Sequence, residues 1–447
     1  MAYSPHTSAD RERMLAAIGV ASVDDLFADI PEAVRASRFE LPPPLSEQEV
    51  RAELARLAGR NRIPAISFLG AGVYRHLVPS VVSEVIGRSE FSTSYTPYQP
   101  EVSQGTLQSI YEFQSLICEL TGMEVASASH YDGATATAEA ALMACRLTRR
   151  GRVAVSTAVN PQVRRVLATY CAGPGIELVE VPADLAQGGT GLTPLEAVAQ
   201  IVDEGFACLV AQQPNIFGGI EPMADLATAA HAVGAQLVAV VEPTSLALLE
   251  APGAYGADIV AAEGQPLGIP PSYGGPYVGL MAARMESVRQ MPGRLVGATR
   301  DGEGRKGYVL TLQAREQHIR REKAASNICT NQALCALAAT AYLTAVGPEG
   351  LREVAELSVA QARHVAAAIE AAGLGVRRFS APYFAEVAIR IPEAARRHAA
   401  LAEQGIVAGL LLEREYPELA DTLLLAATEL TRDDDIDALV TALERSR

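Results

Sequence analysis

Short, continuous apolar runs alternate with helical segments through the middle of this chain. The runs lie at residues 152–156, 176–181, 208–212, 236–241 and 258–262, and helical segments such as 194–203 and 224–233 separate them. Unbroken apolar character is typical of strands that are covered on both faces, and strands alternating with helices favour parallel pairing. The pattern therefore predicts an α/β fold with a mostly parallel sheet.

The first 62 residues have a different pattern and predict an N-terminal helical arm, residues 1–62. Its helices are expected at residues 8–19, near residues 23–34, and from a Ser46–Glu49 capping box to a stop near Gly59. In isolation these helices could not bury their apolar faces.

The remainder divides into two predicted domains. Residues 63–330 form the large α/β domain, which also contains long helices at 103–121 and 133–148. Residues 331–447 form a small C-terminal α+β domain, with an alanine-rich helix, strands near 386–391 and 421–428, and a final helix from Asp433.

Composition and charge argue against several classes of protein: those that bind nucleic acid, those that span a membrane and those that are secreted. The formal net charge is −15, which disfavours the clustered basic surface that nucleic-acid phosphates require. The best membrane-span candidate, residues 236–251, is interrupted by Glu242 and Pro243. The six cysteines include no C-x-x-C pair, and the N-terminus lacks a signal-peptide pattern. We therefore expect a cytoplasmic protein whose partners include neither nucleic acid nor a membrane.

Lysine and histidine limit the available chemistry. Of 37 basic residues only Lys306 and Lys323 are lysines, so a Schiff base has just two candidates. Lys306 lies among glycines, as in a loop, and Lys323 lies in a run of alternating charges, as on a helix face. A solvated charge is the simpler interpretation of both. The histidines never lie three or four residues apart, so no metal site is predicted.

Several dense strings are typical of one known family. They lie at residues 95–105, 131–136, 264–268, 273–279, 315–323 and 326–330, with Ala427-Thr428-Glu429 near the end. Together they resemble the N-terminal half of glycine decarboxylase, the P-protein of the glycine cleavage system, over nearly the whole chain. The resemblance implies the aspartate-aminotransferase-type fold (fold type I) of pyridoxal-phosphate enzymes. It also implies a version in which the two halves are separate polypeptides.

Measured against this family, the groups that hold pyridoxal phosphate are missing. Gln265 lies where the family's catalytic half has the Schiff-base lysine, and glutamine cannot form that bond. Glu242 would lie at the pyridine nitrogen, where the family has aspartate, and Thr157–Ala158 where it has a stacking histidine. The string 132–136 would be the ancestral phosphate cradle, beside His130, which is either a base or a structural histidine. The resemblance therefore implies that a partner binds the cofactor and that this chain does not bind it covalently.

Enzymes of this fold build each active site across a dimer interface, so a subunit without cofactor can complete its partner's site. The catalytic groups expected from this chain are Tyr95, Tyr98, Glu101 and Gln104. The alternative for this string is a proline-rich turn with packed tyrosines. Asn327 and Thr330 are expected to hold the phosphate of the partner's cofactor ahead of a helix. An ordinary N-cap is the alternative there.

The function implied by the resemblance is that of the subunit of glycine dehydrogenase (decarboxylating) that does not bind pyridoxal phosphate. With a homologous subunit that carries the cofactor, in an α2β2 assembly, it would decarboxylate glycine. The aminomethyl group would pass to the lipoyl arm of the H-protein. Two alternatives stay open. One is a stand-alone pyridoxal-phosphate enzyme, which needs a lysine after a strand end. The other is a non-catalytic scaffold or regulator that only docks the H-protein.

Overall fold

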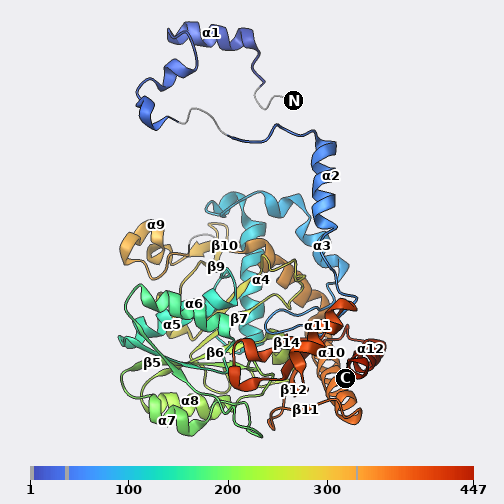
Figure 1. The fold of residues 1–447 in the computed structure, drawn as a ribbon. Helices are drawn as coiled ribbons and strands as arrows, with labels where there is room; N and C mark the ends of the chain where they lie inside the picture. Colours follow the sequence, from blue (N-terminus) through green and yellow to red (C-terminus); the bar gives the residue numbers. More distant parts are fainter. Residues whose placement is uncertain (1–4, 36–39, 329–330, 447) are drawn as a thin grey trace. The chain divides into compact units, whose positions relative to one another are not determined.

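The structure is a computed structural model that describes residues 5–35, 40–328 and 331–446. The chain divides into two compact units, residues 1–62 and 63–447 (Figure 1). The first unit contains the helices α1 (Ser8–Ile18) and α2 (Glu47–Ala58) and two short 3₁₀ helices, Asp24–Phe27 and Glu32–Val34.

Both α-helices of the first unit begin at capping boxes. In α2 the Ser46 hydroxyl accepts the N–H of Glu49, and the Glu49 carboxylate accepts the N–H of Ser46. The single helix expected near residues 23–34 was wrong. Pro31 lies between the two 3₁₀ helices with a non-helical ψ of 135°, and proline lacks the backbone N–H that a continuous helix would need.

The second unit is built on a seven-stranded sheet with the order β2-β8-β7-β6-β5-β3-β4. Strands β3 to β7 pair in parallel, whereas β8 is antiparallel to both β7 and β2. This confirms the predicted α/β fold with a mostly parallel sheet. The strands are β2 (Val125–Ala126), β3 (Arg152–Ser156), β4 (Glu177–Val181), β5 (Phe206–Gln213), β6 (Gln236–Val241), β7 (Ile259–Glu263) and β8 (Gly279–Ala283).

Helices cover both faces of this sheet. One face carries α5 (Gly133–Thr148) and α6 (Pro161–Ala172). The other carries α4 (Gln104–Thr121), α7 (Leu195–Ile201), α8 (Met223–Ala232) and the first half of α10 (Ala333–Ala371). In β6, Leu237 and Ala239 pack on the α8 side, and Val238 and Val240 pack on the α5 side. Burial on both sides explains why the strands read as unbroken apolar runs.

A four-stranded antiparallel sheet with the order β11-β12-β15-β14 forms a separate layer near the C-terminus. Its strands are β11 (Val376–Arg377), β12 (Glu386–Arg390), β14 (Leu410–Leu411) and β15 (Thr422–Ala426), and α11 (Ala394–Glu403) and α12 (Asp433–Arg445) pack with it. The parallel pair β1 (Ile66–Ser67) and β13 (Ile406–Val407) connects residues near the start of the second unit to this layer.

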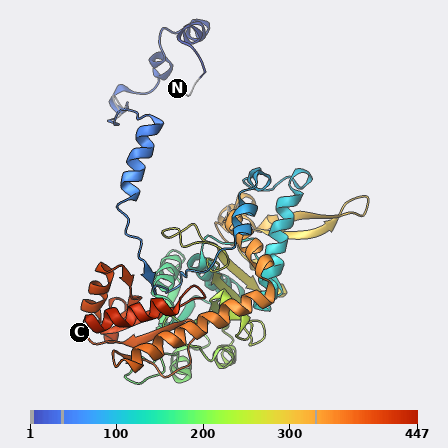
Figure 2. The same cartoon turned by 90° about the vertical axis from the view of Figure 1, so that its right-hand side faces the viewer.

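The long helix α10 packs against both sheets, because an interruption near its middle divides it into two halves. Gly347 has a non-helical conformation (φ 62°) just before Pro348. The first half packs on the large sheet and the second half on the small one (Figure 2). By length and composition alone α10 passes the test for a membrane-spanning helix, as buried core helices also do.

A two-stranded hairpin, β9 (Leu295–Arg300) and β10 (Lys306–Thr311), projects from the second unit (Figure 2). The sequence did not predict it, so the loop expected at Lys306 was wrong. That exposed residue begins β10, with its Nζ 5.2 Å from the centre of the Tyr308 ring. Lys323 was expected to be a solvated charge on a helix face. It ends the short 3₁₀ helix Arg321–Lys323 that follows α9 (Gln317–Arg320), and it is exposed.

Candidate functional site

A pocket of about 260 Å³ lies at the carboxyl ends of β6 and β7, where α5 begins. Sheets of this class place their ligands at this edge. Asp132, Glu242 and Glu263 line the pocket, whereas none of the described residues in the lining is lysine, arginine or histidine. The full lining is Ala71, Gly72, Val73, Tyr74, Asp132, Gly133, Ala134, Asn160, Gln162, Val163, Gln212, Val240, Val241, Glu242, Pro243, Glu263, Pro266, Gly274 and Tyr277.

Gln265 lies two residues after β7 and is 1% exposed. Its Oε1 accepts a hydrogen bond from the N–H of Tyr74 at 2.8 Å. Its Nε2 donates to the carbonyls of Tyr74 and Ile269 at 2.9 and 2.6 Å. The amide therefore uses its oxygen and both N–H groups within the fold. The residue at this position does not fit a covalently held pyridoxal phosphate.

The start of α5, where the phosphate cradle was expected, lies against the end of β7. The N–H of Gly133 donates to Glu263 Oε2 at 2.9 Å, and the N–H of Thr135 donates to Asp132 Oδ1 at 2.8 Å. Burial raises the pKa of Glu263 to about 7. The sequence pointed to residues 132–136 but missed Glu263, because a glutamate at a strand end gives no sign of a partner 130 residues away.

Glu242, at the end of β6, has its carboxylate turned to the backbone that follows. It accepts hydrogen bonds from the N–H groups of Thr244 and Ser245 at 3.0 and 2.7 Å and from the Thr244 hydroxyl at 2.7 Å. Burial raises its pKa. The side chain therefore lines the pocket while it caps the 3₁₀ helix Pro243–Ala247.

Residues 71–74 are held by the small sheet as well as by Gln265. Glu386, the first residue of β12, accepts the N–H of Ala71 at 2.6 Å and the hydroxyl of Tyr74 at 2.7 Å. Burial raises the pKa of Glu386 to about 7, and the nearby charge of Glu242 adds to the effect. This pocket wall is therefore joined to both sheets.

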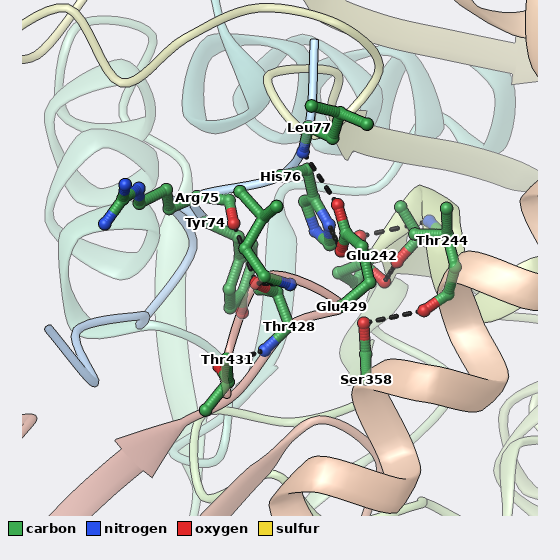
Figure 3. A network of polar contacts seen from close by, with 12 residues as sticks. Tyr74, Arg75, His76, Leu77, Glu242, Thr244, Ser358, Thr428, Glu429 and Thr431 are labelled. Atoms are coloured by element: carbon green, nitrogen blue, oxygen red, sulfur yellow. Dashed lines mark hydrogen bonds and ion pairs between the residues drawn. The ribbon is translucent and has the colours of Figure 1, made fainter. Parts of the chain in front are cut away.

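Residues 75–77, which follow this pocket wall, are held by Thr428 and Glu429, as Figure 3 shows. His76 Nδ1 lies 2.6 Å from Glu429 Oε2, and both side chains are nearly buried. The second oxygen of Glu429 accepts the N–H of Leu77 at 2.7 Å, and the Thr428 hydroxyl donates to the carbonyl of Arg75 at 2.8 Å. One sequence signal pointed to this cluster, since Ala427-Thr428-Glu429 belongs to the strings that resemble the family.

After β3, the pocket is lined by Asn160, the N-cap residue of α6, and by Gln162 and Val163 in the first turn of α6. Thr157 and Ala158, which were expected at the stacking position, do not line the pocket. The Thr157 hydroxyl accepts the N–H of Ala183 at 2.8 Å, and Ala158 is buried in a hydrophobic cluster. The direction of the chain after β3 could not be predicted from the residue types.

His130 is a structural histidine. It is fully buried, its Nδ1 lies 3.1 Å from the Ser127 hydroxyl, and burial lowers its pKa to about 3. Among the described residues, no group of three or more His, Cys, Asp or Glu side chains is placed to hold a metal ion.

The catalytic candidates Tyr95, Tyr98 and Glu101 lie outside the pocket lining, in the segment before α4. Tyr95 is 83% exposed and Tyr98 is 46% exposed, and Glu101 is also exposed. The Arg294 guanidinium lies 5.5 Å from the centre of the Tyr98 ring, and its Nη2 donates to the Tyr98 hydroxyl at 3.3 Å. The His318 ring lies 5.8 Å from the same ring. The structure thus brings the strings 95–105 and 315–323 together.

Gln104, the fourth candidate, is engaged within the chain. Its Nε2 donates to the carbonyls of Tyr308 and Pro100 at 2.8 and 2.9 Å, and its Oε1 accepts the N–H of Tyr308 at 2.9 Å. These bonds attach the β9–β10 hairpin to α4.

Of the phosphate candidates, Asn327 is exposed and Thr330 lies outside the described residues. Next to Asn327, the Ser326 hydroxyl donates to Glu139 at 2.8 Å and accepts the N–H of Ile328 at 3.1 Å. The phosphate role of both candidates stays a prediction.

We expect Gln104→Ala to loosen the hairpin. Leaving the N–H and carbonyl of Tyr308 without their partner costs about 1–3 kcal/mol, so amide hydrogen exchange should accelerate across residues 306–311. Gln108→Ala is the control, because Gln108 is exposed and its side chain donates to exposed Glu112 on the same helix, not to the hairpin. Equal exchange in both variants would contradict the positioning role.

We expect Glu386→Gln to flatten the pH dependence of stability. With a pKa of about 7 against an ordinary 4.5, the folded chain holds a proton that the unfolded chain has released. This contribution is full below about pH 4.5 and is lost as the pH rises through 7. Between pH 5 and 8 the variant should lose about 2–3 kcal/mol less than the parent. Urea unfolding measures this, with the exposed Glu353→Gln as control. An unchanged profile in Glu386→Gln would refute the assignment.

The comparisons with known proteins agree with this geometry. A Moorella thermoacetica protein named probable glycine dehydrogenase (decarboxylating) subunit 1 is 53% identical over 447 residues, covering 99% of both chains. A crystal structure of glycine decarboxylase (P-protein) of the glycine cleavage system, in inhibitor-bound form, has 45% identity, a TM-score of 0.92 and full coverage of both chains.

The fold is shared more widely. The structure of a Burkholderia pseudomallei sphingosine-1-phosphate lyase covers 93% of both chains with a TM-score of 0.62 at 18% identity. This confirms the predicted fold type I of pyridoxal-phosphate enzymes. The family model of the glycine cleavage system P-protein matches residues 1–443. The chain belongs to the glycine cleavage system P-protein family.

Proposed function

We propose that this chain is the subunit of a two-subunit glycine dehydrogenase (decarboxylating) that does not hold the cofactor. A homologous second subunit carries the pyridoxal phosphate. Together they decarboxylate glycine and transfer the aminomethyl group to the lipoyl arm of the H-protein. The name subunit 1, borne by relatives that match the chain from end to end, supports a two-subunit enzyme.

The hydrogen bonds of the buried Gln265 side chain are the observation that supports assigning the cofactor to the second subunit. Pyridoxal phosphate supplies an electron sink for the carbanion that decarboxylation leaves. Here the position of its lysine is taken by a buried amide that bonds to Tyr74 and Ile269. The chain's two lysines lie in the β9–β10 hairpin and in a short exposed turn, outside the pocket lining. A stand-alone pyridoxal-phosphate enzyme therefore receives no support.

The contribution of this chain to the reaction is proposed to lie on its surface. Tyr95, Tyr98 and Glu101 offer two hydroxyls and a carboxylate beside aromatic rings, which suits an environment for glycine or the lipoyl group. Asn327 and Thr330 are proposed to contact the phosphate of the partner's cofactor. Gln104 would act indirectly, by positioning the hairpin beside them.

The proposed assembly is an α2β2 complex in the cytoplasm. Fold type I enzymes bury matched surfaces between subunits, and exposed apolar side chains call for such cover. Leu77, Val102, Ile319 and Leu334 are exposed side chains of this kind. The described cysteines are free thiols, which suits a reducing compartment.

Borohydride reduction of the complex should label only the partner. Neither lysine of this chain lines the pocket, so peptide mapping after reduction with pyridoxal phosphate should find no pyridoxyl-lysine in it. The partner subunit in the same sample is the positive control. A stoichiometric label on Lys306 or Lys323 would overturn the assignment of the cofactor to the partner.

Tyr95→Phe and Tyr98→Phe should each slow glycine–bicarbonate exchange by the assembled complex. Loss of a hydroxyl that leaves a buried group unsatisfied costs about 1–3 kcal/mol, or roughly ten- to a hundred-fold in kcat/KM. The Tm should stay near that of the parent, because both side chains are partly or largely exposed in the isolated chain.

Tyr273→Phe is the matched control for this experiment, since Tyr273 is also exposed, at 85%, but lies outside the string 95–105. If both test variants assemble and turn over like the parent, the two tyrosines are not site residues. A purely docking role for the chain would then be favoured.

A further inference from the structure

The start of α5 has the geometry of an anion site. A helix leaves its first N–H groups without intrahelical partners, and these groups, together with the helix dipole, favour negative charge. In this chain two of them are already taken, because Gly133 donates to Glu263 and Thr135 donates to Asp132. Both acceptors are carboxylates of the chain itself.

We propose that the Glu263 carboxylate is a built-in occupant of the anion site at the start of α5 and closes this pocket to phosphate-bearing ligands. The inference goes beyond the proposed function, since it states how the pocket of this chain is closed, whatever reaction the complex performs.

The fit between β7 and α5 supports permanent occupancy. A Cβ on Gly133 would lie 2.7–2.8 Å from the N, Cα and Cβ atoms of Glu263, so the two backbones are as close as glycine permits. The second oxygen of Glu263 accepts the N–H of Gln265 at 3.0 Å. The carboxylate thus bridges the end of β7 and the start of α5.

The groups that face Glu263 offer no positive charge to a second anion. They are Asp132 at the start of α5, which is a carboxylate, and Tyr277 before β8 and Cys335 on α10, whose raised pKa values keep them neutral at pH 8. Among the described residues that line the pocket, none is lysine, arginine or histidine. A phosphate would therefore meet negative charge without a compensating cation.

The test measures binding of inorganic phosphate to the full-length chain at pH 8, by equilibrium dialysis and by Tm at matched ionic strength. Glu263→Ala empties the site, Glu263→Gln removes the charge but keeps the volume, and the exposed Glu353→Ala controls for net charge. We expect saturable binding by Glu263→Ala, at least tenfold tighter than by the parent. Glu263→Gln and Glu353→Ala should behave like the parent.

Three results would overturn the proposal: phosphate binding by the parent chain, no binding by a folded Glu263→Ala variant, or binding by Glu263→Gln equal to that by Glu263→Ala. The last would mean that repulsion, not occupancy, excludes the anion. None of these results depends on glycine turnover, so a failure here is distinguishable from a failure of the proposed function.

A direct measurement keeps the proposal falsifiable if Glu263→Ala does not fold. Carbonyl-labelled aspartate with ¹⁵N-glycine gives signals only from Asp–Gly pairs, which occur at 132–133 and 301–302. With a Glu263 pKa of about 7, the Gly133 amide should shift between pH 6 and 8.5 in the parent and stay constant in Glu263→Gln. A Gly133 amide that is insensitive to pH in the parent would refute the contact.

Discussion

Both backbone polar atoms of Tyr74 are hydrogen-bonded to one buried side chain, the amide of Gln265, and the pocket wall depends on this pairing. A lysine there could donate to the carbonyl but would offer no acceptor to the N–H. An unsatisfied buried N–H costs about 1–3 kcal/mol. Glutamine satisfies both atoms and forms no Schiff base. The side chain at the position where the cofactor lysine was expected is therefore also the one that holds residues 71–74 in place.

The buried carboxyl groups around this wall follow the same logic. Glu242, Glu263 and Glu386 each accept backbone N–H groups that would otherwise lack partners. Burial raises the pKa of each, so these bonds form at an electrostatic cost. A pocket for an anionic cofactor would place cations here. Instead, carboxylates of the chain itself accept the backbone N–H groups. These bonds stabilise the loops, and the negative charge disfavours the binding of a phosphate.

The central sheet could be predicted from the sequence because a strand that is buried on both faces has an unbroken run of apolar residues, as β6 does. The capping box of Ser46 and Glu49 could also be predicted, since its partners lie three residues apart. Contacts between residues far apart in the sequence could not be predicted from a local pattern. Glu429 meets His76 across 353 positions, and Glu386 meets Ala71 across 315. The β9–β10 hairpin was missed because it lies outside both sheets and its half-exposed strands lack a continuous apolar run.

Two of the strings that carry the family resemblance, 95–105 and 315–323, meet next to a buried ion pair outside the pocket lining. Arg294 and Glu316 have side chains that are almost completely buried, with Nε and Oε2 3.7 Å apart, and Arg294 supports the half-exposed ring of Tyr98. Removing two charges from water is costly, and their mutual attraction offsets the cost only with good geometry and additional hydrogen bonds. Here the pair fixes an aromatic side chain on the surface of the second unit, beside the exposed Tyr95 and Glu101. In the pocket, N–H groups at the start of α5 are occupied by the chain's own carboxylates, whereas the Tyr98 surface is exposed. That contrast supports the interpretation that the chain acts through this surface, on a site that another subunit completes.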